Sequence, residues 1–575
     1  MEYVTTRYAD IFIILCFPLQ LLSILSQYVR MHWKIIPVLD SFGKKRGDAM
    51  VNDDISRRSF LKRSIWIGAG IGGVALAGSG VYHLLRVNDI RELIGGYPAG
   101  AEKYSLNVVN ASAPRPNVVL IYCDDLGYGD VGCFGNTVIR TPHIDSLATE
   151  GTRFTEYYSC NAICAPSRAG LLTGRYPIRT GIIGNTYPED EPVGRVMARN
   201  LGGMLKSLGV MDIREEYIGR GIDPAEITLA EALKVAGYRT GMLGKWHLGD
   251  YSTDPKYNPI RHGFDYYFGV PYSNDMKPFP LYRNETQLEA DLGHDEDQAK
   301  LTELYTREAL KFIEKSSDAP FFLYLAHTFP HQPLFPSERF EKRSHGGKFG
   351  DVVEEIDWSV GEILKCLKRN GLEDNTLVIF TSDNGPWYEG SAGSFRGRKG
   401  QGYEGGFRVP FVARWPERIP RGDVNPATVM NIDLYPTLLS LAGVGLPKDR
   451  IVDGKNIIEI LTGKSSSSPH EALYFFHYDR LEGIRAGRWK YFDKMNRYTW
   501  PIALDTATIP NALGAEQMGD RWPLLYDIRR DPGESYNVIN THPDVAERLD
   551  KALNSFRNKI EKNPRGFIGH PVSRK

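Results

Sequence analysis

Oxygen-donor side chains follow two apolar runs of this sequence. Asp124 and Asp125 come directly after the first run, and Asp383 and Asn384 come after the second. Because the carboxyl ends of parallel strands meet at one edge of an α/β sheet, we expect these four side chains to converge. Such a set favours a hard cation, Ca²⁺ or Mg²⁺, over zinc. Either pair alone would fit an ordinary turn or helix cap, so the interpretation depends on both.

A cysteine stands at the predicted start of a helix. The segment from Cys164 to Arg168 reads CAPSR, and LTGR follows at 172–175. Pro166 suits a first helical turn, where its missing N–H has no partner to lose. Free N–H groups and the helix dipole would favour an anion at that end. The alternative is a buried structural cysteine beside a helix cap.

The segment CAPSR…LTG resembles the sulfatase signature C-x-P-S-R-x-x-x-L-T-G and matches it at every fixed position. Chance agreement at so many positions is improbable, so we favour the sulfatase family over a structural cysteine. The resemblance covers about residues 115–535 and implies an alkaline phosphatase-like fold. It includes LYD at 525–527 and DPGE at 531–534, to which we assign no chemistry.

The family oxidises its motif cysteine to formylglycine, so the resemblance implies this modification of Cys164 and a formylglycine-generating enzyme as partner. One hydroxyl of the hydrated aldehyde would attack sulfur, and the other would later expel sulfate as the carbonyl reforms. The resemblance makes Asp124, Asp125, Asp383 and Asn384 the metal ligands, completed by residue 164. Ca²⁺ is the expected ion, with Mg²⁺ as the alternative.

The hexapeptide GKWHLG at 244–249 is similar to a sulfatase segment of the same sequence. The resemblance implies that Lys245 neutralises sulfate oxygens as a compact positive charge. It implies that His247 accepts a proton when sulfate leaves. It also implies that Arg168 helps to orient the hydrated aldehyde. A lone histidine is usually structural, whereas His247 lies inside an intact segment.

Two further segments extend the implied pocket. PYSND at 271–275 is similar to the arylsulfatase segment PYSHD, which assigns Ser273 to the pocket and puts Asn274 in place of a histidine. His331 falls at the family's sulfate-binding histidine, with His327 as its rival. The substitution at Asn274 leaves the hydrogen bonding around it open.

Lys399 falls at the family's second sulfate-binding lysine. Its neighbour Arg398 is a less favoured substitute, and an ordinary exposed loop lysine is the remaining alternative. The resemblance implies that His331 or Lys399 protonates the departing alcohol.

These matches imply an enzyme that hydrolyses aryl or carbohydrate sulfate monoesters to an alcohol and inorganic sulfate. The nearest alternative is a phosphate or phosphonate monoester hydrolase of the same superfamily, because the two esters are similar in size. An inactive sulfated-glycan-binding protein is a second alternative. It predicts losses in the catalytic set, and Asn274 is the only departure that we find.

Apolar runs alternate with amphipathic stretches through the middle of the chain. This alternation predicts an α/β fold with a large, mostly parallel sheet covered by helices on both faces. Strands are predicted at 117–123, 240–243, 320–326 and 376–381. Helices are predicted at 144–150, 303–315 and 352–369, with a further helix that a capping box opens at Thr228 and Glu231.

The alternation of apolar runs with amphipathic stretches ends at the low-complexity segment 465–468. Short strands are predicted at 472–476, 483–486, 489–492 and 524–526, followed by a closing helix at 545–560. We therefore expect a catalytic domain over 115–464 and a smaller α+β domain over 469–575, with a small antiparallel sheet.

Charge and cysteine content exclude some classes of protein. The leader up to Ala77 carries ten Lys or Arg and six Asp or Glu, so the remainder carries 60 against 64 and a net charge of −4. A chain with this net charge after the leader is not expected to bind nucleic acid electrostatically. Six cysteines in 575 residues are too few for a disulfide scaffold, and none has zinc-type spacing with histidines.

The sequence SRRSFLK at 56–62 precedes an apolar run rich in glycine and alanine at 65–77. This pattern is typical of a twin-arginine export signal, so we expect residues 50–90 to be a signal region and connector. The twin-arginine machinery would then carry the protein to the periplasm or secrete it. A plain membrane anchor is the alternative, although the run is short for a spanning helix.

Residues 1–49 precede Met50 and contain the apolar run 11–29. This run is either a transmembrane segment, which would anchor the protein, or sequence ahead of a wrongly chosen start. We favour the second interpretation.

Overall fold

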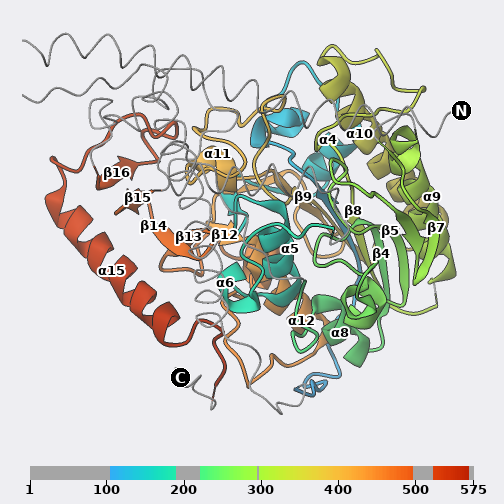
Figure 1. Cartoon of the computed structure of the whole chain (residues 1–575), viewed down its shortest axis with the longest axis horizontal. Helices are drawn as coiled ribbons and strands as arrows, with labels where there is room; N and C mark the ends of the chain where they lie inside the picture. The colour runs from blue at the N-terminus through green and yellow to red at the C-terminus, as the bar shows by residue number, and fades with distance from the viewer. Residues whose placement is uncertain (1–103, 189–220, 294–296, 317, 496–521, 569–575) are drawn as a thin grey trace, which may run out of the picture. The chain divides into compact units, whose positions relative to one another are not determined.

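The order of the strands explains how distant polar residues come together. The computed structural model describes residues 104–188, 221–293, 297–316, 318–495 and 522–568. Ten strands form one sheet in the order β11-β2-β10-β9-β1-β8-β4-β5-β6-β7. The five central strands run parallel: β9 (Thr376–Ser382), β1 (Asn117–Cys123), β8 (Phe321–Ala326), β4 (Arg239–Lys245) and β5 (Tyr266–Val270) (Figure 1).

Antiparallel strands lie on either side of the five parallel strands. On one side β10 (Phe411–Arg414) pairs antiparallel with β9 and with β2 (Thr152–Phe154), and β11 (Asp423–Asn425) lies parallel to β2. On the other side β6 (Leu281–Arg283) and β7 (Thr286–Glu289) extend β5 as an antiparallel hairpin. The predicted mostly parallel sheet is confirmed. The parallel strand β5 and the short outer strands on either side are additions that the sequence pattern did not predict.

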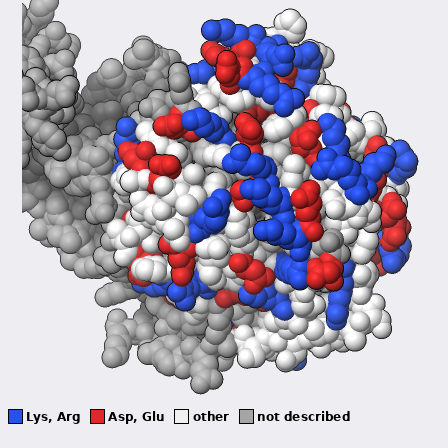
Figure 2. Space-filling view, turned by 90° about the vertical axis from the view of Figure 1, so that its right-hand side faces the viewer, with Lys and Arg blue, Asp and Glu red and all other residues white. Residues whose placement is uncertain are grey.

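Helices cover both faces of the sheet, as expected for buried parallel strands. Alternate residues of β1 enter two separate apolar clusters, with Leu120 in one and Ile121 in the other. The Leu120 cluster includes residues of α5 (Cys164–Thr173), α8 (Leu229–Val235) and α12 (Leu434–Ala442). The Ile121 cluster includes residues of α4 (Pro142–Thr149), α9 (Leu301–Lys315) and α10 (Gly347–Arg369). Basic and acidic side chains are interspersed over the face that carries α9 and β7 (Figure 2).

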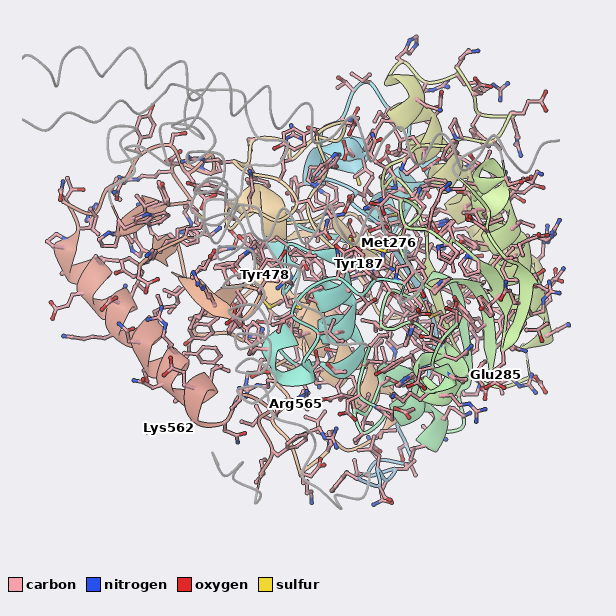
Figure 3. The ribbon with its side chains drawn as sticks, viewed as in Figure 1. Tyr187, Met276, Glu285, Tyr478, Lys562 and Arg565 are labelled. Atoms are coloured by element: carbon pink, nitrogen blue, oxygen red, sulfur yellow. The ribbon has the colours of Figure 1, made fainter. Side chains whose placement is uncertain are left out.

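A smaller sheet follows in the chain. Its strands are antiparallel and lie in chain order: β13 (Leu473–His477), β14 (Arg480–Ala486), β15 (Trp489–Phe492) and β16 (Leu524–Asp527). The helix α15 (Pro543–Lys562), whose last residue is labelled in Figure 3, packs Leu549 and Leu553 into the same apolar cluster as Phe475 and Ile484. The predicted C-terminal α+β arrangement is therefore confirmed.

Most predicted elements occur within a few residues of their expected bounds. The capping box at α8 is present, because Glu231 N donates to Thr228 Oγ1 at 3.2 Å and Thr228 N donates to Glu231 Oε2 at 2.9 Å. The helix α10 begins at Gly347 rather than at 352. The predicted export signal and the apolar run 11–29 lie outside the described residues. Within the described ranges, no helix is both long and apolar enough to cross a membrane.

Candidate active site

The two acidic segments meet because β1 and β9 are neighbours in the sheet. Asp124 and Asp125 follow β1, and Asp383 and Asn384 follow β9. One ligand atom each from Asp124, Asp125, Asp383 and Cys164 lies within 4.8 Å of the others, and all four residues are buried. The convergence expected from the parallel strands is thus present in the structure.

The donor set fits a hard cation. Asp124 Oδ1 and Asn384 Oδ1 are buried and have no hydrogen-bond partner among the described residues. Asn384 Nδ2 donates to Asp125 Oδ1 at 2.7 Å and to the Gly385 carbonyl at 2.9 Å, which fixes the orientation of the amide. Burial and the charge of Asp124 raise the pKa of Asp383 to about 7. A divalent ion would relieve this crowding of carboxylates and bind the two oxygens that lack a hydrogen bond.

Two residues of the site have left-handed backbone conformations. Asp125 has φ of 63° and His247 has φ of 59°. Such angles are uncommon for residues with a side chain and concentrate at functional sites. The turn at Asp125 directs its backbone N–H to Asp383 Oδ1 at 3.1 Å and so links the two strand ends.

Cys164 is the first residue of α5, and its Sγ lies 3.8 Å from Asp125 Oδ1. Burial and the charge of Asp124 raise the pKa of the thiol well above its usual range. A reactive cysteine needs the opposite shift, because the thiolate is the nucleophile. The environment of Cys164 therefore does not activate an unmodified thiol.

Two lysines approach the carboxylates from different strands and loops. Lys245, the last residue of β4, donates from Nζ to the Asp124 carboxylate and to Ser273 Oγ, the latter at 2.8 Å. Lys399 Nζ donates to Asp125 Oδ2 at 2.8 Å. Burial lowers the pKa of Lys399, but the charge of Asp125 outweighs it and the net pKa is well above the usual range. Both lysines can therefore present positive charge to an anion.

The neighbour of Lys399 points elsewhere. Arg398 Nη1 donates to the carbonyl oxygens of Trp387 and Gly390, at 2.7 and 2.6 Å. Lys399, the favoured candidate, is the one that reaches the carboxylate cluster.

Arg168 supports the site from one turn into α5. Its Nε and Nη2 donate to Asp383 Oδ2 at 3.0 and 2.8 Å, and its Nη1 donates to the Lys245 carbonyl at 2.9 Å. Arg168 thereby holds one acidic side chain and the backbone of one lysine in place.

The structure brings His331 to the cluster. His331 Nε2 lies 3.2 Å from Ser273 Oγ and 3.7 Å from Asp125 Oδ2. His327 is buried beside the ring of Tyr305, and both of its ring nitrogens are without a hydrogen-bond partner among the described residues. Of the two rivals, His331 is therefore the one in contact with the site.

Asn274, the one departure from the expected pattern, has a defined place. Its Nδ2 donates to the Pro333 carbonyl at 2.8 Å, so its Oδ1 faces His331 Nδ1 at 3.0 Å. Because that oxygen can only accept, His331 donates from Nδ1 and turns Nε2 toward Ser273. The substitution thus retains an orienting partner for His331.

His247 has one ring nitrogen engaged and one unpaired. Its Nε2 lies 3.2 Å from the Thr186 carbonyl oxygen, and its Nδ1 is buried without a hydrogen-bond partner in the described part of the chain. Since a carbonyl only accepts, Nε2 carries the proton and Nδ1 is the basic atom. Burial and the charge of Lys245 hold the pKa of His247 well below its usual range, which keeps the ring neutral. The sequence contains no signal that would have identified Thr186 as the partner.

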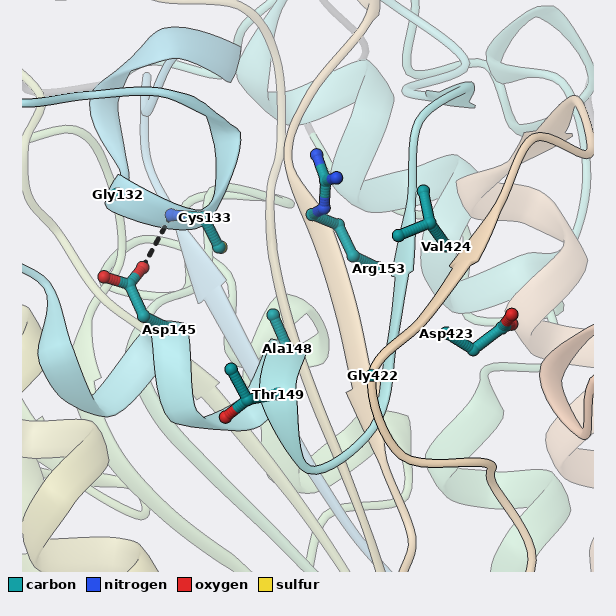
Figure 4. Close-up of a pocket in the computed structure, with 9 residues that line it drawn as sticks. All are labelled: Gly132, Cys133, Asp145, Ala148, Thr149, Arg153, Gly422, Asp423 and Val424. Carbon is teal, nitrogen blue, oxygen red and sulfur yellow. Dashed lines mark hydrogen bonds between the residues drawn. The ribbon is translucent and has the colours of Figure 1, made fainter.

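A separate pocket of about 320 Å³ lies at the edge of the large sheet (Figure 4). Cys133 N donates to Asp145 Oδ1 there at 2.7 Å, and burial and Asp145 raise the pKa of the Cys133 thiol to about 12. None of the residues that line this pocket belongs to the predicted site.

The fold and the carboxylate, lysine and histidine cluster define a hydrolase of anionic esters. The sulfatase family profile matches residues 116–444, and the profile for the C-terminal region of aryl-sulfatase matches 468–568. A C-terminal profile of N-sulphoglucosamine sulphohydrolase also matches 393–513.

Relatives of known name agree with these profiles. The chain is 36% identical to mouse (Mus musculus) N-acetylgalactosamine-6-sulfatase over 81% of its own length and 90% of that protein. It is 32% identical to human (Homo sapiens) steryl-sulfatase over 80% of its own length and 92% of that protein. A solved structure from a Bacteroides thetaiotaomicron glycosaminoglycan locus superposes with a TM-score of 0.63 at 31% identity, covering 77% of this chain and 99% of that one.

The chain belongs to the sulfatase family. It is a sulfuric ester hydrolase with the α/β fold of that family.

Proposed function

We propose that this enzyme hydrolyses sulfate monoesters through a formylglycine made from Cys164, together with a divalent cation. The observation that carries the proposal is the gathering of Asp124, Asp125, Asp383 and Cys164 ligand atoms within 4.8 Å of one another. Around them stand two lysines and a histidine, the groups that an anionic ester needs for binding.

Asp124, Asp125, Asp383 and Asn384 would hold the cation, with residue 164 beside them. Their oxygens favour Ca²⁺, with Mg²⁺ as the alternative. When bound, the ion would withdraw charge from sulfate oxygens and lower the pKa of a hydroxyl next to it. Arg168 keeps Asp383 in place for this role through its two hydrogen bonds.

Residue 164 supplies the nucleophile after modification. The hydrated aldehyde offers one hydroxyl to attack sulfur and a second whose proton is lost when sulfate departs. The raised pKa of the unmodified Cys164 thiol supports this choice, because burial and Asp124 disfavour the thiolate. A formylglycine-generating enzyme is therefore a required partner.

Sulfate oxygens are held by Lys245, Lys399, His331 and Ser273. Lys245 and His331 both contact Ser273 Oγ, at 2.8 and 3.2 Å, so the three side chains form one cradle. Lys399 Nζ donates to Asp125 Oδ2, the oxygen that His331 Nε2 also faces. The proton for the departing alcohol comes from Lys399, or from His331 when its Nε2 also carries a proton; both groups face Asp125.

His247 is the base of the second half-reaction. Its neutral ring and its unpaired Nδ1 suit it to accept the proton of the second hydroxyl. Thr186 holds the ring in the required tautomer from Nε2.

Hydrolysis of three matched substrates tests the function. We expect 4-nitrophenyl sulfate to be hydrolysed with a higher kcat/KM than the corresponding phosphate or methylphosphonate ester. Preference for either phosphorus ester would support the phosphate or phosphonate monoester hydrolase instead. Binding of sulfated glycans without turnover of any ester, in protein with modified residue 164, would support the inactive binder.

The alcohol half of the substrate is an aryl, sterol or carbohydrate group. The two relatives described above act, by their names, on a sulfated amino sugar and on a sulfated sterol. A panel that contains both classes, assayed for released sulfate, separates them by kcat/KM.

We also propose that the protein is exported to the periplasm or secreted through the twin-arginine machinery. The SRRSFLK segment at 56–62 and the apolar run after it support this. An N-terminal membrane anchor in residues 11–29 is the competing proposal, and fractionation of the native protein distinguishes the two.

A further inference from the structure

One residue of the C-terminal region holds both ends of the loop that carries Lys399. Arg396 Nη1, near the start of the loop, donates to the backbone carbonyl of Glu534 at 2.9 Å. The backbone N–H of Glu404, at the end of the loop, donates to Glu534 Oε2 at 2.6 Å. Lys399 lies between these two points in the chain. Glu534 ends the DPGE segment, which the sulfatase chemistry described above does not use.

The side chain of Glu534 is fully buried among charges. Its exposed fraction is 0%, and Lys490 Nζ lies 3.2 Å from Glu534 Oε1 and 2.9 Å from Glu404 Oε1. A buried carboxylate costs free energy unless it is paired and hydrogen-bonded. The backbone of Glu534 also has φ of 49°, an uncommon conformation for a residue with a side chain. A side chain that is costly to bury, on a backbone with a strained conformation, indicates that Glu534 is needed to hold neighbouring groups in position.

The position of the loop ends affects Lys399, because the loop is short and its backbone is tied to neighbouring segments. Gly400 N donates to the Ala162 carbonyl at 2.7 Å, which ties the loop to the segment just before Cys164. A Cβ atom at Gly405 would lie 2.3 Å from the Gly397 carbonyl oxygen, so the two ends of the loop are in close contact.

We infer that Glu534 is a positioning residue that clamps loop 396–404 and thereby aligns Lys399 Nζ with Asp125 and the sulfate site. The inference rests on the proposed role of Lys399. It gives the C-terminal sheet a part in catalysis, since Lys490 of β15 pairs with Glu534 and Glu404 at once.

A double-mutant cycle with Lys399 tests this inference. The full chain, matured with a formylglycine-generating enzyme, is assayed on 4-nitrophenyl sulfate as wild type, Glu534→Ala, Lys399→Ala and the double variant. We expect Glu534→Ala to lower kcat/KM between about tenfold and 10²-fold, as for a small misplacement of a catalytic group. Lys399→Ala should lower it by about 10²-fold or more. In the Lys399→Ala background, Glu534→Ala should cost less than about twofold.

Two further variants separate positioning from general stability. Glu534→Gln keeps an acceptor for the Glu404 N–H and should retain most of the kcat/KM. Asp453 is a matched control, because its largely buried carboxylate also pairs with a cation, Arg179, and accepts a backbone N–H, that of Tyr176. Asp453→Ala should lower the melting temperature without a loss in kcat/KM of the size seen for Glu534→Ala.

The outcomes of the cycle distinguish the positioning role from the proposed function. Losses that multiply in the double variant, or an unchanged kcat/KM in Glu534→Ala, would overturn the positioning role while leaving the proposed function intact. Full activity of Lys399→Ala would instead refute the proposed role of Lys399 and, with it, this inference. If Glu534→Ala does not fold, Arg396→Met removes the other contact of the clamp, and its cycle with Lys399→Ala is interpreted in the same way.

Discussion

His247 Nε2 lies 3.2 Å from the carbonyl oxygen of Thr186. Because a carbonyl oxygen can only accept, this contact leaves Nδ1 of His247 as the basic atom. In the mechanism that we propose, donors around the sulfate serve the first half-reaction and His247 serves the second.

His247→Ala should consequently react once and then stall. With 4-nitrophenyl sulfate we expect a burst of phenol near one equivalent per active site, followed by turnover about 10² to 10⁴-fold slower than wild type. Mass spectrometry of the quenched mixture should find added sulfate on the peptide that contains residue 164. His327→Leu is the control, since this buried histidine lies outside the site. Absence of both burst and adduct, with substrate still bound, would assign His247 to the first half-reaction.

Removal of the cation should reduce both activity and stability. Asp124, Asp125 and Asp383 crowd together with residue 164, so loss of the ion exposes their mutual repulsion. A chelator should lower the melting temperature and kcat, and Ca²⁺ or Mg²⁺ should restore both. Asp124→Ala should weaken cation binding by more than about 10²-fold, measured by calorimetry. Full metal content in that variant, measured by elemental analysis, would count against the assigned ligands.

His327, a buried histidine outside the site, should give a pH-dependent stability. Burial lowers the pKa of His327 to about 3, whereas an unfolded histidine titrates near 6.5. Between these values the unfolded chain binds a proton that the folded chain does not, so the free energy of unfolding falls as the pH falls. The loss from this residue is on the order of a few kcal/mol at the acid end. His327→Leu should flatten the dependence in denaturant titrations between pH 6.5 and 4; an unchanged slope would mean that His327 is not kept neutral.

The export proposal makes a prediction at the other end of the chain. Replacement of Arg57 and Arg58 by lysine should retain the protein in the cytoplasm, because the twin-arginine pair is what the machinery recognises. Fractionation followed by immunoblotting measures this, with Lys62→Arg as the control for a general change of basic residues. Unchanged export of the double variant would favour the simple-anchor interpretation.

Sequence patterns were most informative where an apolar run ends in polar residues. Seven consecutive buried positions precede Asp124, and the same pattern precedes Asp383, so the strand ends and their chemistry could be predicted together. Parallel pairing then placed the two ends side by side. The short outer strands escaped prediction because β6, β7, β10 and β11 have three or four residues each, too few to show a period.

Contacts between residues far apart in the chain were the other feature that sequence patterns could not predict. Glu404 and Glu534 are separated by 130 residues, and no local pattern reports their contact. The same holds for Thr186, whose contact with the His247 ring comes from a backbone carbonyl and so leaves no mark on residue type. The DPGE segment stands out in the sequence, but its role depends on the loop that it touches.

The chemical state of residue 164 tests the central claim most directly. Protein made together with a formylglycine-generating enzyme should yield a tryptic peptide in which Cys164 is converted to the aldehyde, and kcat on 4-nitrophenyl sulfate should rise in proportion to the converted fraction. Cys164→Ala should fold with an unchanged melting temperature and show no turnover. Fully active protein in which the peptide carries only unmodified cysteine would contradict the account.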